Sequence, residues 1–443
     1  MMPSPDAAPP EAAPAHLWLL AVMAAISGVF VGEVGAAFLM VLQQADQSRD
    51  HLIDWARQWP TWGWLIPVTA AAVLVTIARW LVQRLAPEAS GSGVPRVEAV
   101  MRGEVEPEQW VVLPVKFVGG SLAIGAGLAL GREGPLVQMG ATIGALIARV
   151  CGTAPADVRT LSAASAGAGL GVAFNAPLGG LLFVFEELTH RFETRLMVAS
   201  LAACGAGLMT LRTLLGDQPV FALAPLAPPT PESLAIYLLL GAALGALGAL
   251  YNRFVIRWLD WFDRFDRVPV TLRAAAVGGL VGAVAWFDPH LVGGGEPIIQ
   301  GVLNGHFTLV SLATIFAVRW LLGPFSYAAG TPGGLFAPLL LVGAAFGALL
   351  GDALHPLLPE LIPPTSALAL VGMAAFFAAV VRAPLTGVIL IVEMSANTTL
   401  IIPMLAACLT ANIIPALLGS PPIYDTLRER MLGPDHRSAQ RPA

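Results

Sequence analysis

The stretch GREGPLVQMGATIGALI, residues 131–147, places an arginine and a glutamate inside a chain that is otherwise strongly apolar. Glycine lies on both sides of the charged pair and Pro135 follows, as is typical of a tight turn that opens a helix. The unbonded N–H groups of such a turn, together with the positive end of the helix dipole, form a site for an anion. Glu133 is itself an anion that can be titrated, and a buried carboxylate at a helix N-terminus within a membrane predicts a functional site. A soluble phosphate loop is the alternative interpretation, which the apolar run after the motif disfavours.

The composition predicts an all-α polytopic membrane protein. Of the 443 residues, 56% are hydrophobic and 12% are charged, whereas soluble domains carry about 25% charged residues. The mean hydropathy is +0.73, and apolar segments of about 20 residues recur, which argues against a β-barrel. The 46 glycines and 36 prolines fall within and between these segments. Such a distribution is typical of broken membrane helices in close contact.

Charge and cysteine content exclude several other classes of protein. The net charge is −5 without a long basic run, so nucleic acid is not expected as a partner. The three cysteines are scattered and show neither metal-ligand spacing nor a disulfide framework, so we expect no metal and no other cofactor. The N-terminus lacks the basic region of a signal peptide, and the first apolar segment is therefore expected to be retained. We expect a protein of the inner membrane of the cell, and the arginines after Tyr424 predict that its C-terminus lies in the cytoplasm.

The order of the apolar segments divides the chain into two halves. A short polar segment at 1–16 precedes a first half over 17–215, and a proline-rich linker at 216–233 leads to a second half over 234–424. A polar tail is expected over 425–443.

Two local predictions concern the first half. The first span is expected over residues 17–43, followed by a polar loop over residues 44–60. A later helix, over residues 161–188, is expected to break at Asn175-Ala176-Pro177 and to end in Glu186-Glu187.

The second half repeats the first in several places and in the same order. Internal repeats with broken helices are typical of secondary transporters, in which half-helix N-termini face an anionic substrate where the repeats meet. The residues alone leave open whether the repeats are parallel or inverted. The aligned stretches are 131–147 with 334–350, 91–103 with 293–305, and 176–178 with 383–385, and the aligned single residues are Lys116 with Arg319 and Glu186 with Glu393.

Three glycine-rich motifs in this order resemble the CLC family of chloride channels and chloride/proton antiporters. They are GSGVP at 91–95, GREGP at 131–135 and GGLFAP at 333–338, followed by Tyr424 after a proline pair. The resemblance covers roughly residues 17–432 and is closest to the prokaryotic type without C-terminal CBS domains. It implies a helical protein of two inverted repeats whose half-helices meet at a midplane anion site. It also implies a homodimer in membrane lipid with one path per subunit.

The resemblance further implies a role for single residues of the anion path. The hydroxyls of Ser92 and Tyr424 and the backbone N–H groups of Leu335 and Phe336 are expected to bind a dehydrated chloride. Such dipoles stabilise an anion without trapping it. Glu133 is expected to be the gate, which occupies an anion site when it is ionised and moves away when it is protonated.

Glu187 is expected to pass protons between the cytoplasm and the gate, with Glu186 in support. Arg132 is expected to supply positive potential at the outer mouth, beside Gly134 of the same motif. The carboxylate at Glu187 favours exchange of chloride against protons over the alternative, a passive chloride channel of the same fold. A membrane-embedded enzyme with GREGP as a phosphate loop is disfavoured, because no Walker-type lysine or metal cluster accompanies the motif. The chain is therefore not expected to be an enzyme.

Overall fold

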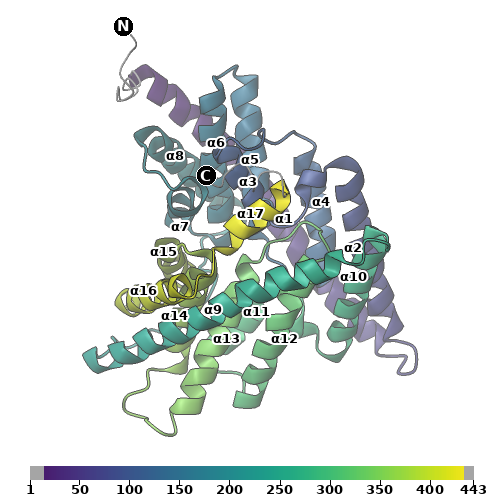
Figure 1. The fold of residues 1–443 in the computed structure, drawn as a ribbon, viewed down its shortest axis with the longest axis vertical. Coiled ribbons are helices and arrows are strands. Elements are labelled where there is room, and N and C mark those ends of the chain that lie inside the picture. Colours follow the sequence, from purple (N-terminus) through teal and green to yellow (C-terminus); the bar gives the residue numbers. More distant parts are fainter. Residues whose placement is uncertain (1–13, 434–443) are drawn as a thin grey trace.

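The computed structural model describes residues 14–433, and this part of the chain is helical apart from two isolated β-bridges. Most of the N-terminal segment expected at 1–16, and residues 434–443 of the expected tail, lie outside the described residues. In Figure 1 the helices of the first half occupy mainly the upper part and those of the second half the lower part.

The helices of the two halves follow one another in a matching order. The first half contains α1 (Pro14–Ala56), α2 (Leu65–Leu85), α3 (Val94–Met101), α4 (Val112–Gly125), α5 (Glu133–Val150), α6 (Pro155–Phe174), α7 (Pro177–Phe183), the π-helical turn Val184–Thr189 and α8 (Thr194–Leu215). The second half contains α9 (Leu234–Asp263), α10 (Val270–Phe287), α11 (Glu296–Leu303), α12 (Leu309–Tyr327), α13 (Phe336–Leu354), α14 (Thr365–Val381), α15 (Pro384–Ser395), α16 (Ile401–Leu417) and α17 (Ile423–Leu432). Short 3₁₀ turns occur at Pro87–Ala89, Pro231–Ser233 and Pro289–Leu291.

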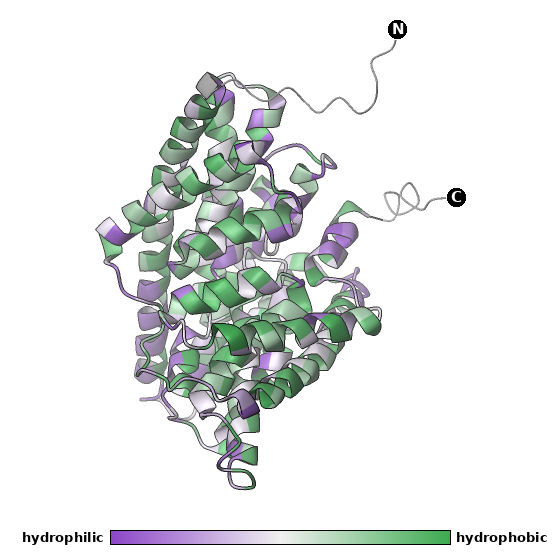
Figure 2. Cartoon of the chain, turned by 90° about the vertical axis from the view of Figure 1, so that its left-hand side faces the viewer, coloured by the Kyte–Doolittle hydropathy of each residue, from purple (hydrophilic) through white to green (hydrophobic). Residues whose placement is uncertain are grey.

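Seven of the described helices have the length and apolar composition needed to cross a bilayer. Four more apolar helices, α4, α14, α15 and α16, are shorter, as expected where a helix is broken inside the membrane. Large apolar side chains such as Trp18, Met209 and Leu409 are exposed on the outer surface, and Figure 2 shows that apolar residues make up most of the helices. Water solvates such a surface poorly, so these apolar faces are typical of a protein embedded in a membrane.

The prediction of a polar loop over residues 44–60 was wrong for most of its length, because α1 continues without interruption to Ala56. This extension contains no glycine or proline, and Ile53 and Ala56 are fully buried against the protein. Arg49 also pairs with Asp46 one turn earlier, at 2.6 Å. Packing of one face therefore keeps the polar end of the helix in place.

The predicted break in the later helix is confirmed. Asn175 ends α6 in the left-handed conformation, with φ 51°, and α7 begins at Pro177, whose missing N–H costs nothing in a first turn. The chain after Tyr424 stays helical to Leu432 and packs on α3 (Figure 1).

The two halves use the same helix pairs. Helix α1 packs on α8 as α9 packs on α16, and α5 packs on α6 as α13 packs on α14. The helices α6 and α14 are buried over nearly their whole length and consist largely of small residues. Small side chains let helix backbones approach closely in a membrane, so the broken helices meet in a tightly packed centre.

Candidate anion and proton site

The three glycine-rich motifs meet at the centre of the molecule through backbone hydrogen bonds. Gly131 and Gly334 exchange both of their hydrogen bonds, at 2.8 and 2.9 Å. The N–H of Gly91 donates to the carbonyl of Thr331 at 3.2 Å, and the N–H of Gly333 donates to the carbonyl of Gly91 at 3.1 Å. Loops from both halves of the chain therefore form one unit, and the helices that begin at these loops start close together.

Glu133 is the first residue of α5 and is completely buried. Its Oε1 accepts hydrogen bonds from the N–H groups of Phe336 at 2.9 Å and Ala337 at 3.3 Å, at the N-terminus of α13. A Cβ atom on Gly131 or Gly334 would overlap the Glu133 carboxylate, so both glycines are needed to make room for it. The carboxylate therefore occupies a helix N-terminal anion site that belongs to the other half of the chain.

Ser92 and Tyr424 place two hydroxyls beside this site. Both residues are buried; the two hydroxyls interact with each other, but among the described residues neither has a partner within full hydrogen-bonding geometry. An unsatisfied buried polar group costs about 1–3 kcal/mol, which a ligand that accepts a hydrogen bond would relieve. Gly93 caps α3 with φ 87°, a backbone conformation that favours glycine. A Cβ on Gly134 would lie 2.8 Å from Ser92 Oγ, so Gly134 lets α5 approach Ser92 closely.

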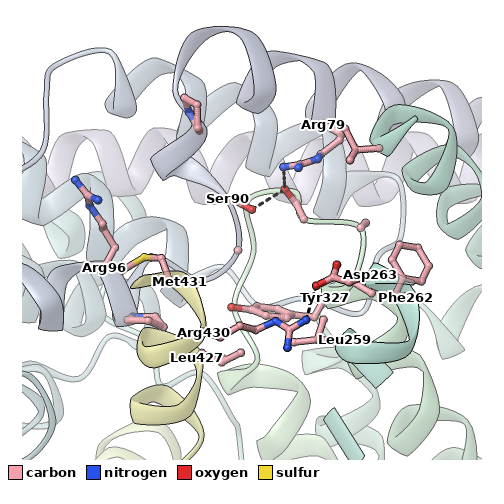
Figure 3. A pocket seen from close by; sticks show the side chains of 18 of the residues that line it. Arg79, Ser90, Arg96, Leu259, Phe262, Asp263, Tyr327, Leu427, Arg430 and Met431 are labelled. Atoms are coloured by element: carbon pink, nitrogen blue, oxygen red, sulfur yellow. Dashed lines mark hydrogen bonds and ion pairs between the residues drawn. The ribbon is translucent and has the colours of Figure 1, made fainter. Parts of the chain in front are cut away.

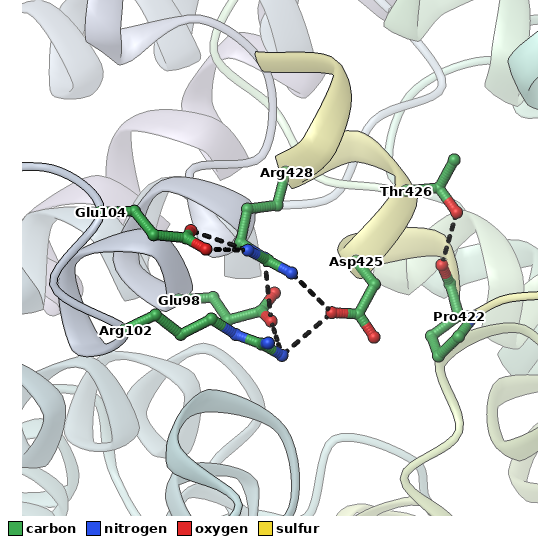
Figure 4. Close-up of polar contacts among 7 residues, drawn as sticks. All are labelled: Glu98, Arg102, Glu104, Pro422, Asp425, Thr426 and Arg428. Atoms are coloured by element: carbon green, nitrogen blue, oxygen red, sulfur yellow. Dashed lines mark hydrogen bonds and ion pairs between the residues drawn. The ribbon is translucent and has the colours of Figure 1, made fainter. Parts of the chain in front are cut away.

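A partly buried group of charges links α17, which carries Tyr424, to α3, which follows Ser92 (Figure 4). Its members are Glu98, Arg102, Glu104, Asp425 and Arg428. Arg428 contacts Glu104 at 2.5 Å, Glu98 at 3.2 Å and Asp425 at 3.2 Å, and Arg102 contacts Glu98 at 2.6 Å and Asp425 at 3.0 Å.

This charged group combines three carboxylates with two guanidiniums. Burial, and after it the neighbouring Asp425, raises the pKa of Glu98 to about 7; Glu98 lies in the short helix α3, outside the membrane-crossing helices. Together with the ion pairs of Arg430 with Asp260 and Asp263 at the end of α9, this charged group holds α17 in place and so positions the Tyr424 hydroxyl relative to Ser92.

Glu187 lies in the π-helical turn Val184–Thr189 and is 5% exposed. The charged groups that act on it include Glu98, Asp425 and Arg102 of the α3–α17 contact. The structure therefore places Glu187 beside the charged group that fixes α17, and not at the loops that hold Glu133.

Glu186 and Glu393 make equivalent contacts across the two halves. Each carboxylate accepts hydrogen bonds from two N–H groups at the start of a helix in the opposite half, where negative charge is stabilised. Glu186 thus caps α15, and its expected support of proton transfer remains a prediction. The contacts are Leu385 N at 3.0 Å and Thr386 N at 2.6 Å for Glu186, and Leu178 N at 3.1 Å and Gly179 N at 2.8 Å for Glu393.

Lys116 and Arg319 are also equivalent, and both are completely buried. Each donates to two carbonyl groups in or next to a glycine-rich turn that precedes a half-helix, α3 or α11. Both cations therefore support the backbone of these turns. The contacts are Ala89 O at 3.0 Å and Gly91 O at 2.8 Å for Lys116, and Gly293 O at 2.6 Å and Val292 O at 3.2 Å for Arg319.

Arg132 lines a cavity of about 330 Å³ together with residues of α1, α4, α8 and α11. Its Nε donates to the carbonyl of Ala173 at 3.1 Å and lies 3.5 Å from a carboxylate oxygen of Glu296. Both charged side chains are about one quarter exposed. Glu296 was not among the predicted site residues, and its charge offsets part of the positive potential expected from Arg132.

Sequence reasoning missed other residues of the site. The N–H of Ala337 could have been expected from its place in the first turn of α13, next to Phe336. The ring of Phe336 packs between Phe377 and Phe174, with centroids 4.1 and 5.1 Å away, and Ser92 N lies 3.4 Å from the hydroxyl of Tyr327. No local pattern marks these distant partners.

Comparisons with known proteins agree with this architecture. The family model described as voltage gated chloride channel matches residues 74–416. The H(+)/Cl(-) exchange transporter ClcA of Cronobacter sakazakii is 37% identical over 426 residues, which cover 95% of this chain and 91% of that protein. The ClcA protein of Vibrio parahaemolyticus is 37% identical over 425 residues, covering 94% and 90% of the two chains.

A solved structure described as a slow cyanobacterial Cl-/H+ antiporter has the same fold. Its TM-score to this chain is 0.89 at 34% sequence identity, over 93% of this chain and 98% of that chain. The expected family resemblance is thereby confirmed, and the chain belongs to the voltage-gated chloride channel, or CLC, family.

Proposed function

We propose that this protein is an antiporter that exchanges chloride against protons across the membrane. The observation that carries the proposal is the Glu133 carboxylate, which occupies the N-terminal anion site of α13. A carboxylate in this place excludes a second anion, and it can be removed by protonation. The relatives named as exchange transporters support the same reaction.

The exchange follows from competition between Glu133 and chloride for one position. The ionised carboxylate accepts from the N–H groups of Phe336 and Ala337. Protonation removes its charge and weakens both charge-assisted hydrogen bonds, so the side chain leaves and chloride takes its place. The hydroxyls of Ser92 and Tyr424, together with the N–H groups of Leu335 and Phe336, hold chloride further along the path.

Glu187 supplies and removes protons on the α17 side. It is buried beside charged groups that reach the surface of the protein, whereas Glu133 lies in the loops where the two halves of the chain meet. A passive channel is the alternative function, and it would leave a buried carboxylate at Glu187 without a role. Arg132 attracts chloride at the outer mouth, where Glu296 moderates its charge.

We further infer the setting of the protein in the cell. The protein lies in the lipid of the inner membrane with α17 on the cytoplasmic side, which the positive charges of Arg428 and Arg430 support by the positive-inside rule. Two identical subunits associate, each with its own path, and apolar side chains exposed on α8 and α16 are available for that contact. The proposed cycle changes only protonation and position, so no enzymatic activity is assigned. Light scattering of the purified protein measures the number of subunits.

The function is tested with purified protein in sealed liposomes. A chloride gradient is imposed without a pH gradient, and the internal pH is recorded at a clamped membrane potential. Protons that move against their own gradient, driven by chloride, are the expected result. Chloride flux without proton movement would make the protein a passive channel and remove the role assigned to Glu187.

A further inference from the structure

A cavity of about 640 Å³ opens beside the GSGVP loop on the α17 side of the molecule (Figure 3). The ends of α2, α9, α10 and α17 surround it. Part of its wall is formed by Gly91 and Gly93, the two residues that flank Ser92. The cavity therefore lies between the surface of the protein and the proposed chloride site.

Positive charge dominates the lining of this cavity. Four arginines face two carboxylates across it, which leaves an excess of positive charge. Two of these arginines are already engaged by acidic groups: Arg430 pairs with Asp260 and Asp263, and Arg96 Nε lies 3.6 Å from Glu108. The charged lining residues are Arg79, Arg96, Arg273, Arg430, Glu88 and Asp263.

The other two arginines, Arg79 and Arg273, form no ion pair within the described part of the chain. Arg79 donates to the carbonyl of Gly330 at 2.9 Å, and Arg273 donates to the carbonyl of Phe262 at 3.0 Å. Each guanidinium has five N–H donors, so most remain available, and Arg273 Nε is buried without a partner. Arg273 also acts electrostatically on Arg79. Two half-buried cations that repel each other at one cavity are stabilised by an anion between them.

The chemistry of the two side chains indicates the class of this anion. Guanidinium groups are planar and bind oxyanions such as phosphate through paired hydrogen bonds. The cavity is far larger than one chloride and falls in the usual range of about 300–1,000 Å³ for sites that bind small molecules. We propose that this cavity binds a phosphate group, held by Arg79 and Arg273.

A phosphate group in this cavity would slow transport, an effect that rests on the proposed function. It would lie against Gly91 and Gly93, and its negative charge would repel chloride that approaches Ser92 from the α17 side. The phosphate group can belong to a free ion or to the headgroup of an anionic lipid. The experiments below separate these two sources.

Binding is measured first, by thermal unfolding of the purified protein in detergent with increasing inorganic phosphate. Sodium chloride keeps the ionic strength constant. We expect the unfolding temperature to rise and then saturate. Arg273→Gln is expected to weaken phosphate binding about tenfold or more, because a charge-assisted hydrogen-bonding partner is lost. The double variant with Arg79→Gln should abolish the shift.

Arg84→Gln is the matched control. Arg84 is an exposed arginine in the last turn of α2 and does not line the cavity, so its variant should bind phosphate like the original protein. Arg273→Gln is less prone to misfold than a change at Arg79, because Arg79 supports the carbonyl of Gly330 beside the GSGVP loop, whereas the hydrogen bond of Arg273 goes to Phe262 at the end of α9. A phosphate shift that is absent, or equal in Arg273→Gln and Arg84→Gln, would overturn the proposal, unless phosphatidylglycerol gives the shift instead.

Transport is measured next, in liposomes of phosphatidylcholine with and without phosphatidylglycerol. If phosphate slows chloride flux in liposomes of pure phosphatidylcholine, and does so less in Arg273→Gln, the free ion is the source of the phosphate group. If only phosphatidylglycerol stabilises the protein and slows the flux, again through Arg273, the source is the lipid headgroup, and the site stands. If exchange is coupled but neither phosphate nor phosphatidylglycerol affects it, the phosphate-site proposal is overturned and the proposed antiport stands. Phosphate binding in a protein without proton coupling would overturn only the proposed antiport.

Discussion

The loop before α5 and the loop before α13 occupy equivalent places in the two halves, yet only the first carries an acid. Residues 131–147 align with 334–350, so Glu133 aligns with Phe336. In the structure these two aligned residues touch, since the Phe336 N–H donates to the Glu133 carboxylate. One half thus supplies a helix N-terminus that attracts an anion, and the other supplies an anion that can be neutralised. The difference between two copies of one loop creates the proposed gate.

Elsewhere the two halves have kept side chains of the same charge at aligned positions, and there the roles are structural. Lys116 and Arg319 each support a glycine-rich turn, and Glu186 and Glu393 each cap a helix of the opposite half. The comparison teaches that residues with an equivalent in the other half hold the scaffold. Residues without such an equivalent, such as Glu133, carry the proposed transport chemistry.

The largest effect is expected from Glu133→Gln, which removes the acid that distinguishes the two loops. The amide keeps the shape of the side chain and cannot be ionised, so proton movement should fall to background while chloride still flows. The measurement is internal pH in liposomes under a chloride gradient. Glu360→Gln is the control, because it neutralises an exposed carboxylate between α13 and α14 and should leave the number of protons exchanged per chloride unchanged. Proton pumping by Glu133→Gln would contradict the proposed gate.

Glu187→Gln should also abolish proton movement and keep chloride flux. Met394 stands at the position aligned with Glu187 in the second half. The substitution therefore removes a second acid that has no acidic equivalent in the other half. Glu393→Gln is the matched control and should lower stability without affecting coupling. Parallel recordings of chloride efflux and internal pH check both variants, and coupled exchange in Glu187→Gln would show that protons enter elsewhere.

Ser92→Gly copies the glycine that the second half has at the aligned position, Gly294. Loss of a hydrogen bond to a charged group costs about 1.5–3 kcal/mol, so chloride affinity should fall roughly tenfold or more. Titration calorimetry with chloride measures this affinity. An unchanged affinity would mean that the Ser92 hydroxyl does not contact the ion.

Lys116→Met and Arg319→Met test the residues that the halves share. Each substitution leaves buried carbonyls without a donor, at about 1–3 kcal/mol per group, so both variants should unfold at similarly reduced temperatures. Thermal unfolding in detergent makes the comparison. Loss of stability in one variant alone would show that the two cations are not equivalent.

The smallest effect is expected from Glu98→Gln, which copies Gln300 of the second half. The pKa of Glu98 is raised from 4.5 to about 7, so the folded protein binds more protons than the unfolded chain between these values. Its contribution to stability is therefore present at low pH and lost as the pH rises through about 7. Unfolding measured across this range should show a weaker pH dependence in the variant, whereas an unchanged dependence would assign the pH effect to other groups.

Much of the fold could be predicted from the sequence, because the length of an apolar segment indicates a membrane helix and glycine and proline mark where that helix is broken. The break at Asn175 and the half-helix starts at Glu133 and Phe336 follow from local chemistry alone. The continuation of α1 to Ala56 did not, since it depends on burial of Ile53 by distant helices.

The site was predictable only where a motif marks it. The contact of Glu133 with Ala337 joins two loops that lie far apart in the sequence, and no local pattern states which carboxylate meets which helix. Arg428 was expected only as a positive charge on a tail, yet it is buried among acids from α3 and α17. Long-range pairs of charges decide these details, and a single sequence does not contain their geometry.

The central claim is that chloride and the ionised Glu133 side chain compete for one position. The most direct test is calorimetry of chloride binding in two buffers with different heats of protonation, near neutral pH. We predict that chloride binding takes up protons, because the displaced carboxylate becomes protonated, and that Glu133→Gln binds chloride without this uptake. Chloride binding that takes up no protons in the original protein, or equal uptake in Glu133→Gln, would contradict the account.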